Sequence, residues 1–149
     1  VQTCALPICS MMRKKIFPLV LVLLIIMALV GCSFSVSTAN VKEVYPCKSV
    51  DSDGKPVDET DVFSTSDTVM YVSALTANIP DDTIVRIAWK YNDGSEEYAV
   101  DEIELTIDEA RYIQTHLNVE DGFSVGTYLA QFYINDREEP DKVATITVK

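Results

Sequence analysis

The sequence is short of the residues from which catalytic and metal centres are usually built. Of its 149 residues only one is a histidine, and no HExxH motif, Gly-x-Ser-x-Gly motif, glycine-rich phosphate loop or internal repeat is present. A metal site or a nucleophilic triad needs several such groups to converge on one point. We therefore expect His116 to be a surface or rim residue, and we expect no cofactor and no enzymatic activity.

Cysteine is scarce where it could form disulfides. Cys4 and Cys9 lie in residues 1–10, an expected artefactual leader whose residues 1–8 resemble the translation of a sequencing-library adapter. Cys32 lies in a motif that predicts its modification. Cys47 is then left without a partner, so no intramolecular disulfide framework is possible. We expect Cys47 to be a small buried residue of the first strand. Nothing near it in the sequence supports the alternative of a redox or intermolecular role.

Basic residues are few after position 32. All 23 acidic residues lie in this part, whereas three of the 12 basic residues precede it, so residues 32–149 carry nine basic residues and a formal charge of −14. So acidic a surface repels nucleic acid and anionic lipid headgroups. We therefore expect no nucleic acid among the partners.

The sequence contains one long apolar run, over residues 16–30, directly after three basic residues at positions 13–15. The run is shorter than the roughly 20 residues that a membrane-spanning helix needs. A basic region, an apolar region of this length and a small residue after it are typical of a secretory signal that is removed.

The apolar run ends in Leu29-Val30-Gly31-Cys32, which resembles the lipobox of bacterial lipoproteins. The resemblance implies cleavage before Cys32 and transfer of a diacylglyceryl group to its thiol. Two or more acyl chains anchor a protein stably, since each buried CH₂ contributes about 0.8 kcal/mol. We expect lipid attachment to the cell membrane or the outer membrane, with the domain outside the cytoplasm; Ser33 resembles an outer-membrane sorting signal. An ordinary secretory signal followed by a chance cysteine is the alternative.

These features divide the chain after its leader of ten residues. The start of the natural protein is expected at Met11 or Met12. Residues 11–31 form the expected signal peptide, residues 32–40 the lipidated cysteine with a short tether, and residues 41–149 one folded domain.

The domain alternates short runs rich in Val, Ile, Thr and Tyr with turn signals, which is typical of an antiparallel sandwich. In the clearest run, Val85, Ile87 and Trp89 share one face. Residues 108–117 fit either a helix or a strand, and we favour a strand because the neighbouring segments are strands. The predicted strands are 41–50, 68–77, 83–91, 97–107, 108–117, 128–135 and 144–148, with Phe63 as an apolar plug in the first long connection.

Several residues along these strands are shared with a known kind of domain: Phe63, Asp67-Thr68, Trp89-x-Tyr91, Val125-Gly126-x-Tyr128 and a β-branched last strand. This pattern resembles the immunoglobulin-like domain of many prokaryotic lipoproteins, although Ser124 replaces a frequent proline. It implies an all-β fold, an immunoglobulin-like antiparallel β-sandwich of about seven strands. Trp89 is expected to fill the space between the sheets, and Tyr128 to hydrogen-bond back to the preceding turn. The resemblance carries no catalytic residue or ligand.

Acidic residues provide the remaining candidate sites. Asp51, Asp53 and Asp58 are weak candidates for calcium ligands, because calcium takes oxygens from acidic loops. Their spacing departs from an EF-hand loop, however, and Asp53-Gly54 is also a common turn. The acidic runs at 96–97 and 101–104 could supply paired carboxylates, but a small sandwich has little room for the cleft that acid–base catalysis needs. We expect solvated strand faces there.

Together these features predict a membrane-anchored, non-catalytic module that contacts an unknown protein or glycan. Two alternatives stay open: a small envelope hydrolase or enzyme-accessory subunit, and a calcium-stabilised structural spacer. An enzyme would show a pocket with convergent polar groups, whereas a binding module would show an exposed aromatic or apolar patch.

Overall fold

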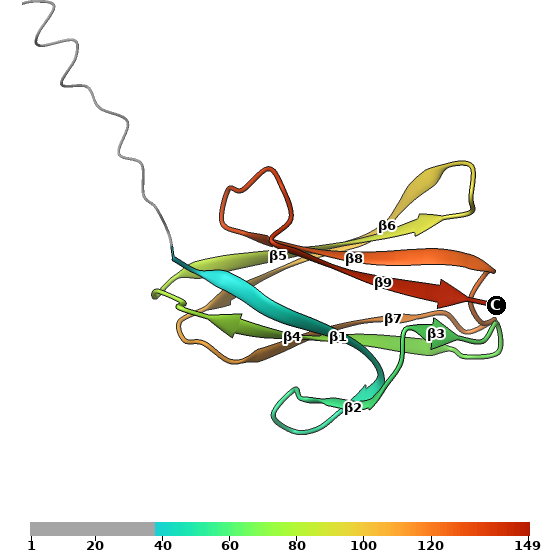
Figure 1. Ribbon diagram of the computed structural model, residues 1–149, viewed down its shortest axis with the longest axis horizontal. Helices are drawn as coiled ribbons and strands as arrows, with labels where there is room; N and C mark the ends of the chain where they lie inside the picture. Colours follow the sequence, from blue (N-terminus) through green and yellow to red (C-terminus); the bar gives the residue numbers. More distant parts are fainter. Residues whose placement is uncertain (1–37) are drawn as a thin grey trace, which may run out of the picture. The chain divides into compact units, whose positions relative to one another are not determined.

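The computed structural model describes residues 38–149, which form two packed β-sheets (Figure 1). This part of the chain contains nine strands and no helix. The strands are β1 (Asn40–Val50), β2 (Pro56–Glu59), β3 (Val62–Phe63), β4 (Val69–Ala77), β5 (Thr83–Asn92), β6 (Glu97–Ile107), β7 (Tyr112–Asn118), β8 (Gly126–Ile134) and β9 (Lys142–Val148). The predictions for the leader, the signal peptide and Cys32 fall on residues outside this described part.

The strand order confirms the predicted immunoglobulin-like sandwich. One sheet has the order β2-β1-β4-β7 and the other the order β3-β9-β8-β5-β6. The division of β1, β4 and β7 from β5, β8 and β9 is the one an immunoglobulin sandwich makes, with β6 joined to the second sheet. The pairs are antiparallel except β3 with β9, which is parallel. The number of strands exceeds the expected seven because residues 56–63, predicted as a connection, contribute two short strands.

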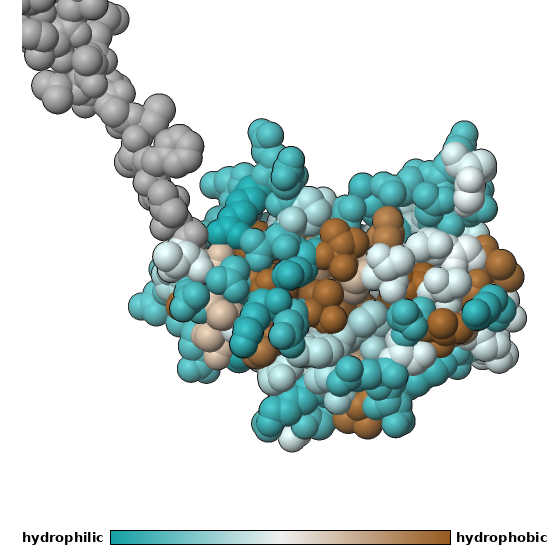
Figure 2. Space-filling model, in the orientation of Figure 1, coloured by the Kyte–Doolittle hydropathy of each residue, from teal (hydrophilic) through white to brown (hydrophobic). Residues whose placement is uncertain are grey.

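The core lies between the sheets and uses the faces that alternation predicted. Val85, Ile87 and Trp89 of β5 are fully buried, and so are Ala130 and Phe132 of β8. Figure 2 shows hydrophobic side chains along the middle of the face that carries β1 and β9, with hydrophilic ones above and below. These two strands meet there although they belong to different sheets.

A buried hydrogen bond joins the sheets at the centre of the core. Trp89 Nε1 donates to Thr115 Oγ1 on β7 over 2.9 Å, and Trp89 is fully buried, while Thr115 is 4% exposed. The segment 108–117, which fitted either a helix or a strand, is a strand from Tyr112 onward, whereas residues 108–111 connect β6 to it. On β7, Ile113, Thr115 and Leu117 face inward, while His116 faces out.

Two glycine turns differ in how tightly they are packed, and Tyr128 lies beside the segment after one of them. Gly122 has φ +82°, and a Cβ there would collide with the main-chain oxygen of Thr65, whereas a Cβ on Gly94 would meet no atom within 4 Å. Burial raises the pKa of the Tyr128 hydroxyl, while hydrogen bonds with the main chain and side chain of Ser124 act in the opposite direction. Tyr128 thus lies beside Ser124 of the preceding turn, on the side where the hydrogen bond was expected.

The loop between β8 and β9 holds the start of β1. Arg137 Nη2 donates to the Ala39 carbonyl over 2.6 Å and Arg137 also pairs with Asp141. Asp141 in turn accepts the main-chain N–H of Val41. Ala39 is itself buried, so the chain is clamped as soon as it enters the sandwich, at the end opposite the C-terminus (Figure 1). We call these contacts the β1 clamp.

Candidate functional site

On the side of the five-stranded sheet that faces away from the core, charged, aromatic and small side chains of β5 and β8 lie next to one another. β5 and β8 pair so that Arg86 lies opposite Tyr133 and Lys90 lies opposite Leu129, with Ala88 opposite Gln131 between them. Ala88 and Tyr133 are each only 8% exposed. We call this surface, made by these six residues, the outer face.

Arg86 lies over an aromatic ring on the outer face. Its guanidinium carbon is 3.9 Å from the ring centroid of Tyr133, and Arg86 Nη1 is 3.4 Å from Glu102 Oε2. The Tyr133 hydroxyl donates to Gln131 Oε1 over 2.9 Å. A cation over a ring contributes about 0.5–1 kcal/mol at an exposed site. These contacts restrict the rotamers of Arg86 and Tyr133.

A second cation lies two strand positions beyond Ala88. Lys90 Nζ donates to Glu97 Oε1 over 2.7 Å, and this bond raises the pKa of Lys90 above its usual value. Lys90 is therefore charged at neutral pH. The outer face thus presents two oriented cations separated by a small alanine, in a domain whose net charge is strongly negative.

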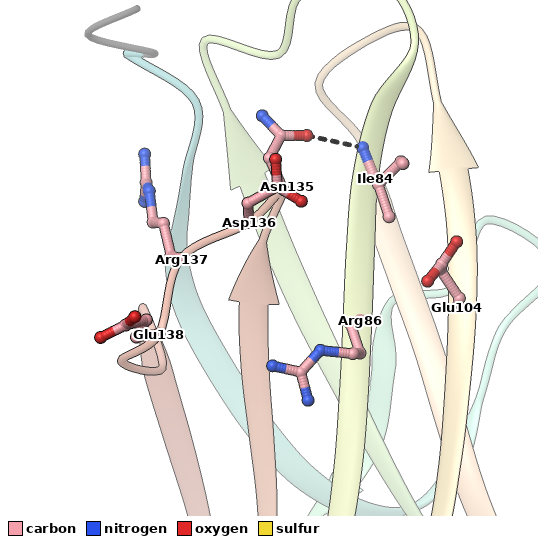
Figure 3. A pocket seen from close by; sticks show the side chains of 7 residues that line it. All are labelled: Ile84, Arg86, Glu104, Asn135, Asp136, Arg137 and Glu138. Atoms are coloured by element: carbon pink, nitrogen blue, oxygen red, sulfur yellow. Dashed lines mark hydrogen bonds between the residues drawn. The ribbon is translucent and has the colours of Figure 1, made fainter. Parts of the chain in front are cut away.

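Two open depressions meet at Arg86. The first, of about 330 Å³, is lined among others by Ala88, Lys90 and Val100, which is 44% exposed beside an irregularity in β6. The second, of about 350 Å³, lies between Arg86 and the loop after β8 (Figure 3). There the Asn135 side chain accepts the main-chain N–H of Ile84 over 2.9 Å and shapes the rim.

His116 lies on the other sheet, away from the outer face. It is exposed on β7 and its ring packs against Tyr71, with ring centroids 5.2 Å apart. Over residues 38–149 no group of three or more His, Cys, Asp or Glu side chains is arranged to hold a metal ion.

The three candidate calcium ligands, Asp51, Asp53 and Asp58, do not form a common site. Asp51 Oδ1 accepts the main-chain N–H groups of Asp53 and Lys55, both over 2.9 Å. Asp53 lies 3.6 Å from Lys55 Nζ. Asp58 has φ +54° in β2. The structure therefore accounts for Asp51 as the residue that closes a turn, and it does not bring the three carboxylates together.

The acidic runs of β6 are exposed, as expected for a solvated strand. Two of their members, Glu97 and Glu102, pair with the cations of β5. Tyr98 faces Tyr91 across the hairpin, with ring centroids 6.3 Å apart and planes at 22°. This arrangement is a cross-strand pair, which stabilises a hairpin.

Cys47 is buried in the first strand, as predicted. It does not belong to the cluster of apolar side chains between the sheets. It lies where β1 pairs with both neighbours, opposite Glu59 of β2 and Tyr71 of β4. Burial raises the pKa of its thiol, which disfavours the reactive thiolate form.

Comparison with known proteins adds no assignment. No protein-family model matches the chain. No curated protein matches it either. Among the described residues, no helix is long and apolar enough to cross a membrane.

Proposed function

We propose that this chain is a lipid-anchored module outside the cytoplasm that binds a protein or a glycan, without catalysing a reaction. The observation that carries the binding role is the outer face, where Arg86 is held over Tyr133 beside the buried Ala88. Arginine and tyrosine are enriched among the residues that dominate binding energy. Side chains held in place before binding lose less entropy when a partner docks.

The anchor is supported by the motif that ends in Cys32 and by the short segment after it. Residues 33–40 span at most about 26–29 Å when fully extended. The proposed lipid on Cys32 would therefore keep the sandwich close to its membrane. The fold itself does not identify the partner, because immunoglobulin-like sandwiches present exposed faces and loops to many kinds of ligand. The partner is therefore inferred from the side chains of the outer face.

Metabolic labelling with a palmitate analogue tests the anchor. The wild-type chain and Cys47→Ala are expected to be labelled, whereas Cys32→Ala is expected to lose the label and to leave the membrane fraction. Cys47→Ala is the matched control, because it removes a thiol that is buried in the fold. Equal labelling of both variants would contradict the assignment of the lipid to Cys32.

Site-specific photo-crosslinking tests the outer face. A photoreactive residue at position 88 is expected to form adducts on intact cells, whereas the same residue at the exposed Gln114 on the other sheet is expected to form none. Arg86→Ala is expected to lower the yield from position 88, since it removes the cation over Tyr133. Equal yields from positions 88 and 114 would show that the outer face has no special role.

A further inference from the structure

β6 is an open edge of the five-stranded sheet (Figure 1). It pairs with β5 on one side, and no described strand pairs with its other side. About half of the main-chain N–H and C=O groups of such a strand point away from its neighbour, where an added strand can pair with them. One donor of β6 is already engaged, since the Glu102 N–H donates to Asp101 Oδ1 over 2.9 Å. β6 has 11 residues, whereas β3 at the opposite edge has two. Natural sheets usually keep their edges short, so the length of β6 calls for an explanation.

The two sides of β6 differ in chemistry. On the outer side, Glu102 and Glu104 lie opposite Ala88 and Arg86 and are exposed. Glu104 makes no ion pair with another described residue, and Glu102 is only loosely paired with Arg86 at 3.4 Å. On the inner side, Ile103 and Leu105 alternate with them and pack against the core while remaining partly exposed. Over residues 102–105, a strand added beside β6 would meet carboxylates on the outer side and apolar side chains on the inner side, and Asp101 adds a carboxylate opposite Trp89 on the inner side.

We propose that β6 accepts an extended segment of a partner protein as a tenth strand, and that this segment alternates basic and apolar side chains. Main-chain hydrogen bonds supply the affinity in binding of this type, and the alternate side chains supply the specificity. The basic side chains lie beside Glu102 and Glu104, and the apolar ones cover Ile103 and Leu105. The inference rests on the proposed function, because the added strand extends the outer face past its edge.

The charge of β6 favours a basic segment of a partner protein over a second copy of this chain. From its first to its last residue β6 carries Glu97, Asp101, Glu102 and Glu104 and no basic residue. Two such edges in contact would place like charges on neighbouring strands, which is destabilising. The same charges attract a basic strand, so they disfavour pairing between copies and favour a partner of opposite charge.

A synthetic peptide of alternating lysine and valine tests the proposal. The full-length chain in detergent is titrated into a fluorescein-labelled peptide, and anisotropy reports binding. A peptide of the same sequence, methylated on alternate main-chain nitrogens, keeps every side chain but loses the donors for strand pairing. It is expected to bind at least about tenfold more weakly. A block peptide with all lysines before all valines is expected to bind similarly weakly.

Matched variants distinguish binding at β6 from a general attraction between the basic peptide and the acidic domain. The double variant Glu102→Gln/Glu104→Gln is expected to weaken binding about fivefold. The control Glu59→Gln/Glu120→Gln removes the same total charge at exposed positions away from β6 and is expected to leave affinity within about twofold. Hydrogen exchange with bound peptide is expected to slow at β6 amides and not at β7 amides.

Several results would overturn the strand addition. The N-methylated peptide could bind as tightly as its parent, the control variant could weaken binding as much as the β6 variant, or protection could appear at β7. Protection of β6 that grows with protein concentration in the absence of peptide would assign the edge to a second copy. None of these outcomes alters palmitate labelling at Cys32 or adduct formation from position 88, so the proposed function stands or falls separately.

Discussion

Replacing Thr115 with valine removes the acceptor of the bond that Trp89 donates across the two sheets. Valine has nearly the shape of threonine, so the change creates no cavity. It leaves the indole N–H of a fully buried side chain without a partner, because the bond to Thr115 is the hydrogen bond that this N–H makes in the fold. An unsatisfied buried donor costs about 1–3 kcal/mol. For a domain of this size each kcal/mol lowers Tm by about 4 °C, so we expect a decrease of about 4–12 °C.

The single tryptophan of the chain makes the assay direct, because its fluorescence reports on the altered site. Urea unfolding followed by Trp89 emission gives the free energy of unfolding. Thr145→Val on β9, an exposed position, is the control and is expected to change stability by less than about 0.5 kcal/mol. In a Trp89→Phe background, where unfolding is followed by circular dichroism, Thr115→Val is expected to change the free energy of unfolding little, because the indole N–H donor is absent. A wild-type-like midpoint for Thr115→Val in the natural background would refute the reasoning.

Other predictions concern turns, the thiol and pH. Gly122→Ala is expected to lower the free energy of unfolding by about 3 kcal/mol or more, because the added Cβ meets a main-chain oxygen. Gly94→Ala is expected to lower it by only about 1 kcal/mol, because its positive φ is the one obstacle there. Thermal unfolding compares the two variants. Cys47 is expected to react with N-ethylmaleimide at least about a hundredfold more slowly when folded than in urea, as peptide mass mapping would show. The bond from Lys48 lowers the pKa of Asp67. The ion pair of Lys48 and Asp67 therefore stabilises the fold fully above the unfolded-state pKa of about 3.9, and this stabilisation is lost as the pH falls through the folded-state pKa. Asp67→Asn should lower the free energy of unfolding at pH 7 and make that free energy decline less steeply in acid, as urea unfolding at several pH values would show.

The strands that could be predicted from sequence are those whose two sides meet different surroundings. β5 alternates cleanly because Ile87 faces the core and Arg86 faces solvent. β4 shows no such alternation, and the structure explains why. Ser73 is buried on this strand, and its hydroxyl donates to the Gly54 carbonyl in the turn between β1 and β2. The hairpin therefore covers part of β4, so both sides of this strand select small or apolar residues.

The short strands and the outer face depend on contacts between distant segments. β3 has two residues and exists because Phe63 pairs with Val148, which is far from it in the sequence. No local pattern can reveal a strand of that length. Alternation placed Arg86 on the outward side of β5, but its position over Tyr133 follows from the register between β5 and β8. That register is set by turns and core packing rather than by either segment alone.

The β1 clamp also determines how a pulling force would travel through the domain. Tension arriving through Thr38 enters at β1 in the four-stranded sheet, whereas a partner on β5, β6 or β8 would hold the five-stranded sheet. The load must therefore pass from one sheet to the other. Because Arg137 and Asp141 tie the first residues of β1 to the loop after β8, part of the load is transferred at once, before it reaches the ladder between β1 and β4. Cutting this link with Arg137→Ala would leave that ladder to be peeled apart one bond at a time.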